Sequence, residues 1–578
     1  MSKYFIKYKR RKTMKTFENF VYVRPDIKKE QELFYIFLAD FRKAASVSEA
    51  NKAIEKINEQ RNRLSSLFNI VYIRSSIDTN DEFYQKERDF FDDIDPEITA
   101  LHTAFYKELI KSPFRLELEK KWGKQLFDIA DYTIKAFSEE VIQLLKEENK
   151  LTSAYAKLVA SAQVEFQGEV YTLAQLSPFA QDQDRETRKK AIQASTGFFE
   201  KHQGEFDDLY DKLVKIRHKI ATTLGYKNFI ELGYIRMLRV DYDTTMVEKF
   251  RKQVREVIVP LVSKLYEKQK KRIGVNTLKF HDENFKFKDG NAKPKGDPQW
   301  IIENGKKMYE ELSLETKDFF QYMLDRNLMD LEAKKGKEAG GYCTFVEDYQ
   351  APFIFANFNG TSGDVDVLTH EAGHAFQVYS SRNIGIPEYI WPTYESAEIH
   401  SMSMEFFTWP WMELFFKEET DKYKYTHLAD GLQFIPYGVA VDEFQHQVYE
   451  NPEWTPSDRK KAWKKLEEIY LPHREYDNNA YLAAGGFWQR QGHIYEVPFY
   501  YIDYTLAQIC AFQFWKRSQE NYQEAWEDYL KLCKLGGSKS FLGLLESANL
   551  QSPFKEGTIE AVVQTIEEWL DQVDDTSL

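Results

Sequence analysis

Two histidines and one glutamate stand close enough in the sequence to act together. His370 and His374 lie one helical turn apart in the stretch L-T-H-E-A-G-H-A-F-Q-V-Y. On a helix their imidazoles project from one face and can bind a single ion. Glu371 follows the first histidine and can reach a water held by that ion without replacing either ligand. These three residues predict a metal site that activates water.

The spacing is the H-E-x-x-H pattern that is typical of zinc peptidases. In a chain with 11 histidines and 92 acidic residues among 578 positions, chance would produce this pattern only about 0.03 times. Apolar residues recur from Val365 to Val378 around the motif, which predicts a largely buried helix. Buried histidines need polar partners, and a metal ion is one such partner.

A third ligand is expected, because a catalytic zinc ion usually has three protein ligands and one open position. Downstream, the stretch P-T-Y-E-S-A-E-I-H-S-M-S-M-E contains Glu395, Glu398 and Glu405. Spacing alone does not choose between Glu395 and Glu398. His400 is a further candidate, which we assign to the core or to the support of a ligand.

The runs F-N-G-T-S-G-D-V-D-V-L-T-H-E-A-G-H and A-E-I-H-S-M-S-M-E resemble the thimet oligopeptidase and oligoendopeptidase F family of zinc peptidases. Within that family they are most similar to the Pz-peptidase branch. The family has its third ligand some two dozen residues after the second histidine, and a glutamate follows seven positions later. The resemblance therefore implies Glu398 as the third zinc ligand and Glu405 as the residue that supports a ligand histidine.

A second stretch, G-G-F-W-Q-R-Q-G-H-I-Y-E-V-P-F-Y-Y-I-D-Y, carries His493, Tyr500, Tyr501 and Tyr504. Amide hydrolysis creates an oxyanion, which histidine and tyrosine donors can stabilise. The alternative is an aromatic helix face, in a chain that is 15% aromatic. The family carries a histidine and, some twelve residues later, a tyrosine in this region, so the resemblance implies His493 and Tyr504 as catalytic donors. The interval here is one residue shorter, which leaves the substrate contact open between Tyr500 and Tyr501.

The loop K-K-G-K-E-A-G-G-Y-C-T-F leads into the strand that we expect before the metal helix. Gly340, Gly341 and Tyr342 are therefore candidates for the border of a substrate cleft. A peptide could bind there as an additional strand on an exposed sheet edge. An ordinary loop is the alternative.

Helical periodicity dominates the rest of the chain. The region that follows Pro25 has no glycine before Gly123 and carries apolar residues at helical spacing. The segment from Val164 to Leu173 alternates about a Gln-Gly pair, which predicts a short hairpin. The run from Pro352 to Asp364 predicts a strand, a turn and the beginning of the metal-site helix.

With the resemblance, these patterns predict a mainly α fold: a helical two-lobed zincin with a deep substrate cleft and a small β-sheet beside the HExxH helix. We expect a basic tail over residues 1–24, an N-terminal helical lobe with a short hairpin over 25–200, and a catalytic lobe over 201–578. The basic start contains a second methionine, Met14, which we consider beside Met1 as the original start.

Composition narrows the class of protein. The net charge of −13 gives no reason to expect nucleic acid as a partner. Cys343, Cys510 and Cys533 are too few and too scattered for a disulfide framework, which suits a reducing cytoplasm. No apolar stretch reaches the roughly 20 residues of a membrane helix, and the basic start lacks the apolar core of a signal peptide. We therefore predict a cytoplasmic protein without a membrane partner.

We predict a zinc-dependent endopeptidase that hydrolyses internal bonds of short oligopeptides through a metal-activated water, with one Zn²⁺ as cofactor. The preference for short peptides is implied by the resemblance alone. A metallocarboxypeptidase of related helical fold is the first alternative. A non-catalytic helical binding scaffold is the second. No feature of the sequence indicates an oligomeric state.

Overall fold

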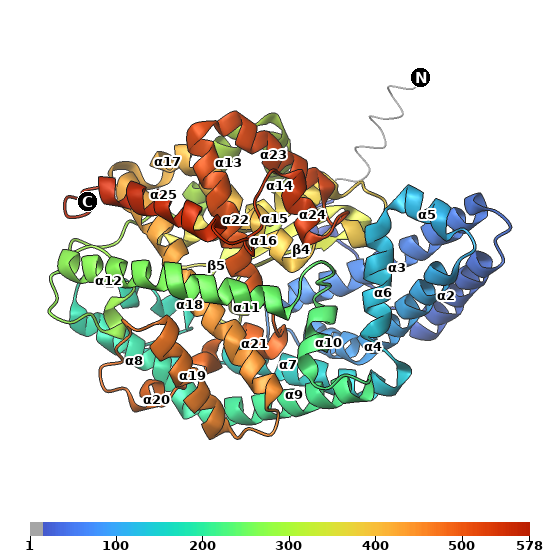
Figure 1. Ribbon diagram of the computed structural model, residues 1–578, viewed down its shortest axis with the longest axis horizontal. Coiled ribbons are helices and arrows are strands. Elements are labelled where there is room, and N and C mark those ends of the chain that lie inside the picture. The colour runs from blue at the N-terminus through green and yellow to red at the C-terminus, as the bar shows by residue number, and fades with distance from the viewer. Residues whose placement is uncertain (1–14) are drawn as a thin grey trace.

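Long helices build the N-terminal lobe. The computed structural model describes residues 15–578, and α2 to α6, drawn in blue and cyan, lie on the right of Figure 1. Helices α2 to α7 span Ile27–Arg42, Val47–Ile77, Glu82–Lys111, Arg115–Trp122, Lys124–Lys135 and Ile142–Ala160. Ser46 and Asp81 cap α3 and α4, because their side chains accept hydrogen bonds from backbone N–H groups of the first turn. Ile54, Phe105 and Leu126 are buried together between α3, α4 and α6.

A hairpin and a second group of helices follow. The hairpin predicted near residue 164 consists of β1 (Val164–Phe166) and β2 (Glu169–Tyr171), which pair antiparallel. Its turn residues, Gln167 and Gly168, both have positive φ angles of 51° and 89°, as a two-residue turn of this kind requires. Helices α8 to α14 span Arg185–Lys201, Gln203–Thr223, Phe229–Arg236, Thr244–Gln253, Val259–Ile273, Pro298–Leu312 and Leu314–Asp325.

A small sheet leads the chain into the predicted metal helix. Its strand order is β3-β5-β4, with β3 at Met329–Glu332, β4 at Tyr342–Val346 and β5 at Ala351–Phe358. The central strand β5 pairs parallel with β3 and antiparallel with β4. Nearly all of β5 is buried, which explains its apolar sequence from Ala351 to Ala356. The strand β4 lies at an edge of the sheet.

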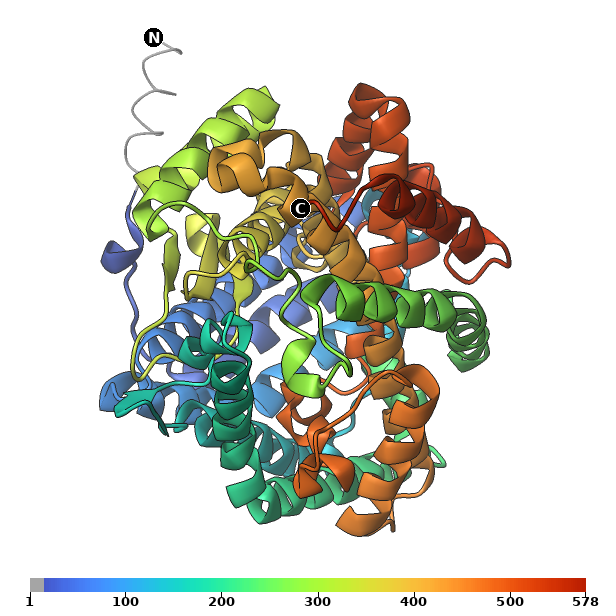
Figure 2. The same ribbon diagram turned by 90° about the vertical axis from the view of Figure 1, so that its left-hand side faces the viewer.

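The metal helix α15 (Gly363–Ser381) packs across α16 (Tyr394–Phe407), and both lie near the centre of the molecule (Figure 1). A Cβ atom at Gly373 would lie only 2.6 Å from the carbonyl oxygen of His400. The two helices can therefore cross this closely only with glycine at that position. Figure 2 shows α8 and α9 (teal) below this central region and the last helices of the chain (red) above it.

The remaining helices enclose α15 and α16. They are α17 (Glu413–Phe416), α18 (Thr420–Glu450), α19 (Pro456–Tyr470), α20 (Ala480–Ala483), α21 (Gly492–Glu496), α22 (Tyr501–Glu520), α23 (Tyr522–Leu535), α24 (Phe541–Ser547) and α25 (Thr558–Gln572). Helix α22 packs along α16 and α18. The predicted mainly α, two-lobed fold with a small sheet beside the HExxH helix is confirmed.

The described part of the predicted basic tail packs against the sheet. Residues 1–14, with the two candidate start methionines, lie outside the described residues. Phe17 and Phe20 are buried, at 7% and 2% exposure. Their rings pack on Phe353 and Tyr349, with centroid distances of 4.5 and 3.8 Å. The apolar contact therefore anchors this segment beside β5. The lobe boundary near residue 200 stays a prediction.

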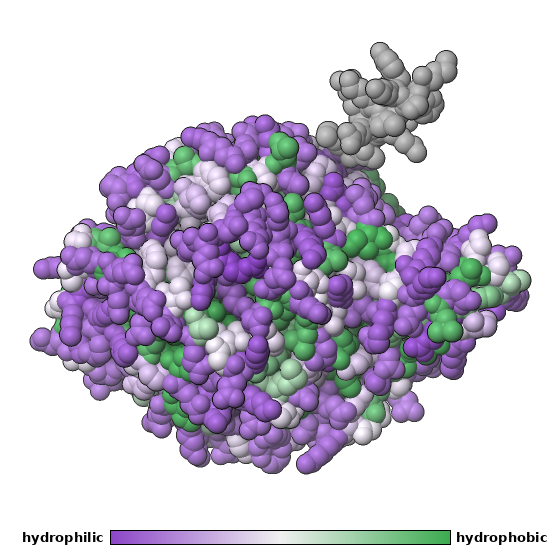
Figure 3. Space-filling model, turned by 45° about the horizontal axis from the view of Figure 1, so that its top comes forward, coloured by the Kyte–Doolittle hydropathy of each residue, from purple (hydrophilic) through white to green (hydrophobic). Residues whose placement is uncertain are grey.

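The face of the molecule that Figure 3 shows is mainly polar. Figure 3 shows a face on which hydrophilic side chains dominate and hydrophobic ones form small scattered groups. No helix within residues 15–578 combines the length and the apolar character that a membrane span needs. Cys343, Cys510 and Cys533 are all free thiols.

Candidate metal centre and active site

Helices α15 and α16 bring three possible metal ligands together. The Nε2 atoms of His370 and His374 lie 3.2 and 3.3 Å from Oε2 of Glu398. The ligand atoms of these residues all lie within 4.8 Å of one another. Two imidazole nitrogens and one carboxylate oxygen are a donor set of catalytic zinc sites, which leave a further position open. The residues present therefore fit a zinc ion.

Glu395 and His400 lie on the same helix but face elsewhere. Oε1 of Glu395 accepts a hydrogen bond from the Thr393 hydroxyl at 2.7 Å. Burial, with the nearby charge of Asp503, raises the pKa of Glu395 to about 8. His400 is buried with Nδ1 2.7 Å from the carbonyl oxygen of Ser396. Neither belongs to the three-residue group.

Glu371 lies between the metal ligands and the sheet. A Cβ atom at Gly341 would lie 3.3 Å from Oε1 of Glu371, so the backbone before β4 passes directly over this carboxylate. The side chain is buried, and Oε2 has no hydrogen-bond partner among residues 15–578. Burial raises the pKa of Glu371. A buried carboxylate with a free oxygen is suited to exchange a proton with a substrate or a water.

Glu405 lies behind the first histidine. Its Oε1 atom is 2.7 Å from Nδ1 of His370. Because a carboxylate only accepts, Nδ1 of His370 carries a proton, and Nε2 would be the nitrogen that offers its lone pair to a bound metal ion. A carboxylate at this nitrogen orients a histidine ligand toward its metal ion.

His493 on α21 and Tyr504 on α22 face each other across the same cleft. The Nε2 atom of His493 is 3.1 Å from the hydroxyl of Tyr504. Burial lowers the pKa of His493 to about 4, so the ring is neutral at pH 7. Burial also raises the pKa of the Tyr504 phenol, which keeps its proton. Both groups can therefore donate a hydrogen bond at neutral pH.

The two intermediate tyrosines have different surroundings. The Tyr500 hydroxyl donates a hydrogen bond to Oε1 of Glu398 and lines the cleft with the candidate ligands. Tyr501 packs against Phe434 and Tyr437, with ring centroids 5.7 Å away in each case. It lines a neighbouring cavity instead. Tyr500 is therefore the one that lies beside the metal ligands.

A cleft of about 860 Å³ contains this group of residues. Its walls come from α3 and α6 of the N-terminal lobe, which contribute Tyr72 and Ile129, and from the sheet and helices around α15. Gly341 and Tyr342 line it as predicted, whereas Gly340 is not among the lining residues. The carbonyl oxygen of Gly340 accepts a hydrogen bond from Asn357 at 2.8 Å instead. Gly340 therefore shapes the loop beside the cleft.

One edge of β4 faces the cleft. Phe345 lies opposite Pro352, which has no N–H group. Phe345 therefore occupies a non-hydrogen-bonded position of the antiparallel ladder, and its backbone groups point away from β5. Asn69 of α3 donates to the Phe345 carbonyl oxygen at 2.8 Å. Two residues earlier, Cys343 has the same orientation and lines the cleft, so its backbone groups are available to an extended peptide.

Comparison with known proteins places this architecture in a family. The model of the "Peptidase M3 N-terminal domain" matches residues 17–137, and the model of "Peptidase family M3" matches residues 179–564. The chain belongs to peptidase family M3. It is therefore a metalloendopeptidase, which excludes the non-catalytic scaffold considered from the sequence.

Individual relatives agree with this assignment. The M3 peptidase is 26% identical to an oligoendopeptidase F homolog of Borreliella burgdorferi over 459 residues, which are 75% of this chain and 74% of the relative. It is 21% identical to oligopeptidase PepF of Bacillus subtilis over 571 residues, which are 92% and 82% of the two chains. A solved structure, PZ peptidase A with an inhibitor, is 60% identical, with a TM-score of 0.96 over 97% of this chain and all of that one. The resemblance predicted from the sequence is confirmed.

His427 of the M3 peptidase was not predicted from the sequence. Its Nε2 atom is 2.7 Å from Oε2 of Glu405, and its Nδ1 atom accepts a hydrogen bond from Trp409 at 3.1 Å. Because the indole only donates, Nδ1 of His427 has no proton and Nε2 donates to Glu405. Hydrogen bonds thus connect Trp409 with His427, Glu405 and His370. They determine which ring nitrogen of each histidine carries the proton. No motif marks His427, which comes from α18.

Gln491 was also missed. Its amide nitrogen is 2.7 Å from Nδ1 of His493, and the Tyr437 hydroxyl donates to its amide oxygen at 2.7 Å. These two bonds orient the amide, so Gln491 donates to Nδ1 and the proton of His493 is on Nε2. The ring nitrogen that faces Tyr504 is therefore a donor. The sequence signal that could have indicated Gln491 is its place two positions before His493.

Proposed function

We propose that this M3 peptidase is a zinc-dependent oligopeptidase that hydrolyses internal bonds of short peptides. His370, His374 and Glu398 would hold the zinc ion. The observation that carries the proposal is the convergence of two imidazole nitrogens and a carboxylate oxygen within 4.8 Å, in a cleft that also contains Glu371. A cleft of about 860 Å³ between two lobes accommodates an extended segment rather than a folded domain.

When bound, zinc supplies Lewis acidity, which polarises the scissile carbonyl and lowers the pKa of water. Glu371 takes the proton of the attacking water and later delivers it to the leaving amine. Its position supports this role, because it follows a ligand histidine and has one carboxylate oxygen without a partner. The backbone at Gly341 covers Glu371 and limits its access to bulk water.

His493 and Tyr504 stabilise the oxyanion. The proton on Nε2 of His493 points toward the Tyr504 hydroxyl, so the phenol can use its own proton for the substrate oxygen. Donors that are already oriented stabilise developing charge without further reorganisation. Gln491 and Glu405 maintain the proton positions of the two histidines on which this arrangement depends.

The substrate would bind in extended form along the cleft-facing edge of β4. The free backbone groups of Cys343 support this mode, and Asn69 limits it to the part of the strand before Phe345. Gly341 and Tyr342 would border the bound chain, and Gly340 would hold the loop. Of the two tyrosines left open by the sequence, we propose Tyr500 as the one beside the substrate.

A cytoplasmic location is part of the proposal. It is supported by the free thiols of Cys343, Cys510 and Cys533, since structural disulfides are typical of oxidising compartments. Fractionation of cells that produce the protein, followed by assay of peptidase activity, tests the location. Activity confined to an extracytoplasmic fraction would contradict it.

The Glu371→Gln variant tests the catalytic assignment. The amide keeps the shape of the side chain but cannot accept the proton of the attacking water, so hydrolysis should fall to below about 1% of wild type. The zinc content after dialysis should stay at wild-type level, because Glu371 is not a ligand. Retention of more than a few per cent of the activity would mean that another group is the base.

A further inference from the structure

Arg490 is the only arginine within residues 15–578 that forms neither a hydrogen bond nor an ion pair. It lies at the end of η11 (Phe487–Arg490), three residues before His493. Its guanidinium has a neighbour in the ring of Phe487, at 5.1 Å from the centroid. Arg474 approaches the same ring at 4.8 Å but also forms an ion pair with Glu283 at 3.0 Å. Arg490 is exposed to solvent and carries a positive charge without a carboxylate partner.

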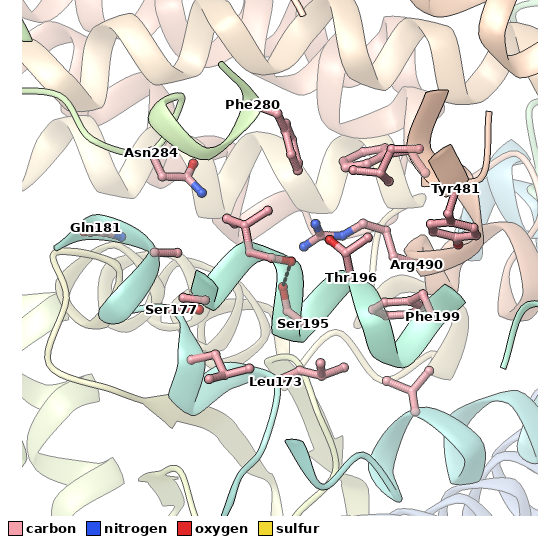
Figure 4. A pocket seen from close by; sticks show the side chains of 17 residues that line it. Leu173, Ser177, Gln181, Ser195, Thr196, Phe199, Phe280, Asn284, Tyr481 and Arg490 are labelled. Atoms are coloured by element: carbon pink, nitrogen blue, oxygen red, sulfur yellow. Dashed lines mark hydrogen bonds between the residues drawn. The ribbon is translucent and has the colours of Figure 1, made fainter. Parts of the chain in front are cut away.

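This charge enters a cavity of about 330 Å³. Figure 4 shows the guanidinium of Arg490 pointing into the cavity between Phe280 and Thr196. Arg490 is the only charged residue among those that line the cavity.

The other lining groups suit an organic ligand. The side chains of Ser177, Thr196 and Asn284 form no hydrogen bond with any residue from 15 to 578, so their polar atoms can accept or donate to a guest. Apolar groups such as Phe199 and Leu482 complete the walls. One cation, a few unpartnered neutral polar groups and an apolar wall are complementary to a carboxylate on an apolar body.

Two further cavities lie between this cavity and the active-site cleft, and neighbouring members of the row share wall residues. Gln181 and Asn284 line both this cavity and a second one, and that second cavity shares Asp430 with a third. The third shares His493 and Tyr504 with the main cleft. The walls of the active-site cleft and of the Arg490 cavity are thus built from neighbouring residues on the same side of His493 and Tyr504.

We propose that this cavity is a carboxylate-binding site and that its occupant is the C-terminal carboxylate of the peptide substrate. Arg490 would form the ion pair, and an apolar C-terminal side chain would pack near Phe199 and Leu482. The assignment to the substrate rests on the proposed peptidase function. It adds a preference for peptides with a free C-terminus, whereas hydrolysis of an internal bond itself needs no such group.

The test compares two internally quenched peptides that differ only in a C-terminal carboxylate or amide. For the wild-type holoenzyme, KM should be about fivefold to tenfold lower for the acid than for the amide, as expected for a charge-assisted hydrogen bond. The ratio should fall to about 1 in Arg490→Gln and recover in part in Arg490→Lys. Lys190→Gln is the matched control, because Lys190 is exposed on α8, is not among the lining residues and carries the same charge.

A second measurement separates the two sources of a carboxylate. Calorimetric titration with N-acetyl-phenylalanine reports binding of a free acid by wild type and by Arg490→Gln. Binding that depends on Arg490, with equal KM values for the two peptides, would support the site but overturn its assignment to the substrate. An acid-to-amide ratio that is the same in wild type and Arg490→Gln, with no Arg490-dependent binding of the free acid, would overturn the site itself. Failure of wild type to hydrolyse either peptide would contradict the proposed function, while the titration would still test the cavity.

Discussion

The carboxylates of α16 illustrate how surroundings decide the role of a residue. Glu398 lies between two imidazoles, whereas Glu395 accepts a hydrogen bond from Thr393 beside Asp503. We therefore expect Glu398→Ala to lose zinc on dialysis and Glu395→Ala to retain it, since only the first removes one of the three ligands. Metal analysis of both dialysed proteins decides the matter. The reverse pattern would transfer the ligand role to Glu395.

Tyr504 and Tyr500 should give different phenotypes when the hydroxyl alone is removed. Tyr504→Phe should lower kcat by about 10²–10³, or roughly 3–4 kcal/mol, with little change in KM or zinc content, because it deletes a transition-state donor. Tyr500→Phe should instead weaken zinc retention, because the Tyr500 hydroxyl donates to Glu398. Steady-state kinetics with metal analysis on the same samples checks both. Normal kcat in Tyr504→Phe would remove that residue from the oxyanion site.

At the residue scale, the sequence predicted those site residues that lie within one helical turn of each other. His370, Glu371 and His374 could be chosen because four positions make one helical turn. Spacing left Glu395 and Glu398 equivalent, although their environments differ once α16 packs on α15. His427 could not be predicted, because it reaches Glu405 from another helix and no pattern connects the two.

At the scale of elements, the contact between η7 (Glu347–Tyr349) and α3 contains an unusual carboxyl group. Glu347 accepts hydrogen bonds from the hydroxyls of Ser65 and Ser66 at 2.5 and 3.3 Å. Burial raises its pKa from 4.5 to about 7. The folded state favours the protonated form of Glu347. Below about pH 4.5 the group is protonated in both the folded and the unfolded protein, so its ionisation does not lower the free energy of unfolding there. The penalty for ionisation grows as the pH rises and is complete above about pH 7.

The Glu347→Gln variant should therefore be more stable than wild type at pH 8, by up to about 3 kcal/mol, and the gain should shrink toward zero near pH 4.5. The amide preserves the size of the side chain and has no charge to bury. Urea unfolding midpoints at pH 8 and pH 5 measure the difference. If the variant were less stable than wild type by the same amount at both pH values, ionisation of Glu347 would not lower the stability of the folded protein.

The sequence pattern predicted several helices and strands correctly. The alternation around Gln167 and Gly168 predicted the hairpin, and the apolar run before the motif predicted β5. At the beginning of α15, the side chain of Ser362 does not cap the helix. Asp364 instead accepts hydrogen bonds from the backbone of Asn359 and Gly360, both at 2.8 Å. The sequence pattern predicted where the helix begins. The packing around that point determines that Asp364 accepts the hydrogen bonds.

At the scale of the whole molecule, the cleft depends on contacts between distant segments. Arg61 of α3 pairs with Glu388 of η8 (Pro387–Tyr389) at 2.7 Å, and the Tyr106 hydroxyl donates to the same carboxylate oxygen at 2.5 Å. Arg61 and Glu388 are 327 positions apart in the chain, so no local pattern links them. The sequence predicted two lobes through family resemblance, whereas the pairs that hold the lobes together required the folded structure.

The central claim is that a bound zinc ion and the residues around it cleave internal peptide bonds. The most direct test is hydrolysis of a peptide that is acetylated at its N-terminus and amidated at its C-terminus, with the products identified by mass. We expect two internal fragments, loss of activity after removal of the metal with a chelator, and recovery on addition of zinc. An intact blocked peptide, or cleavage that persists in metal-free protein, would contradict the account.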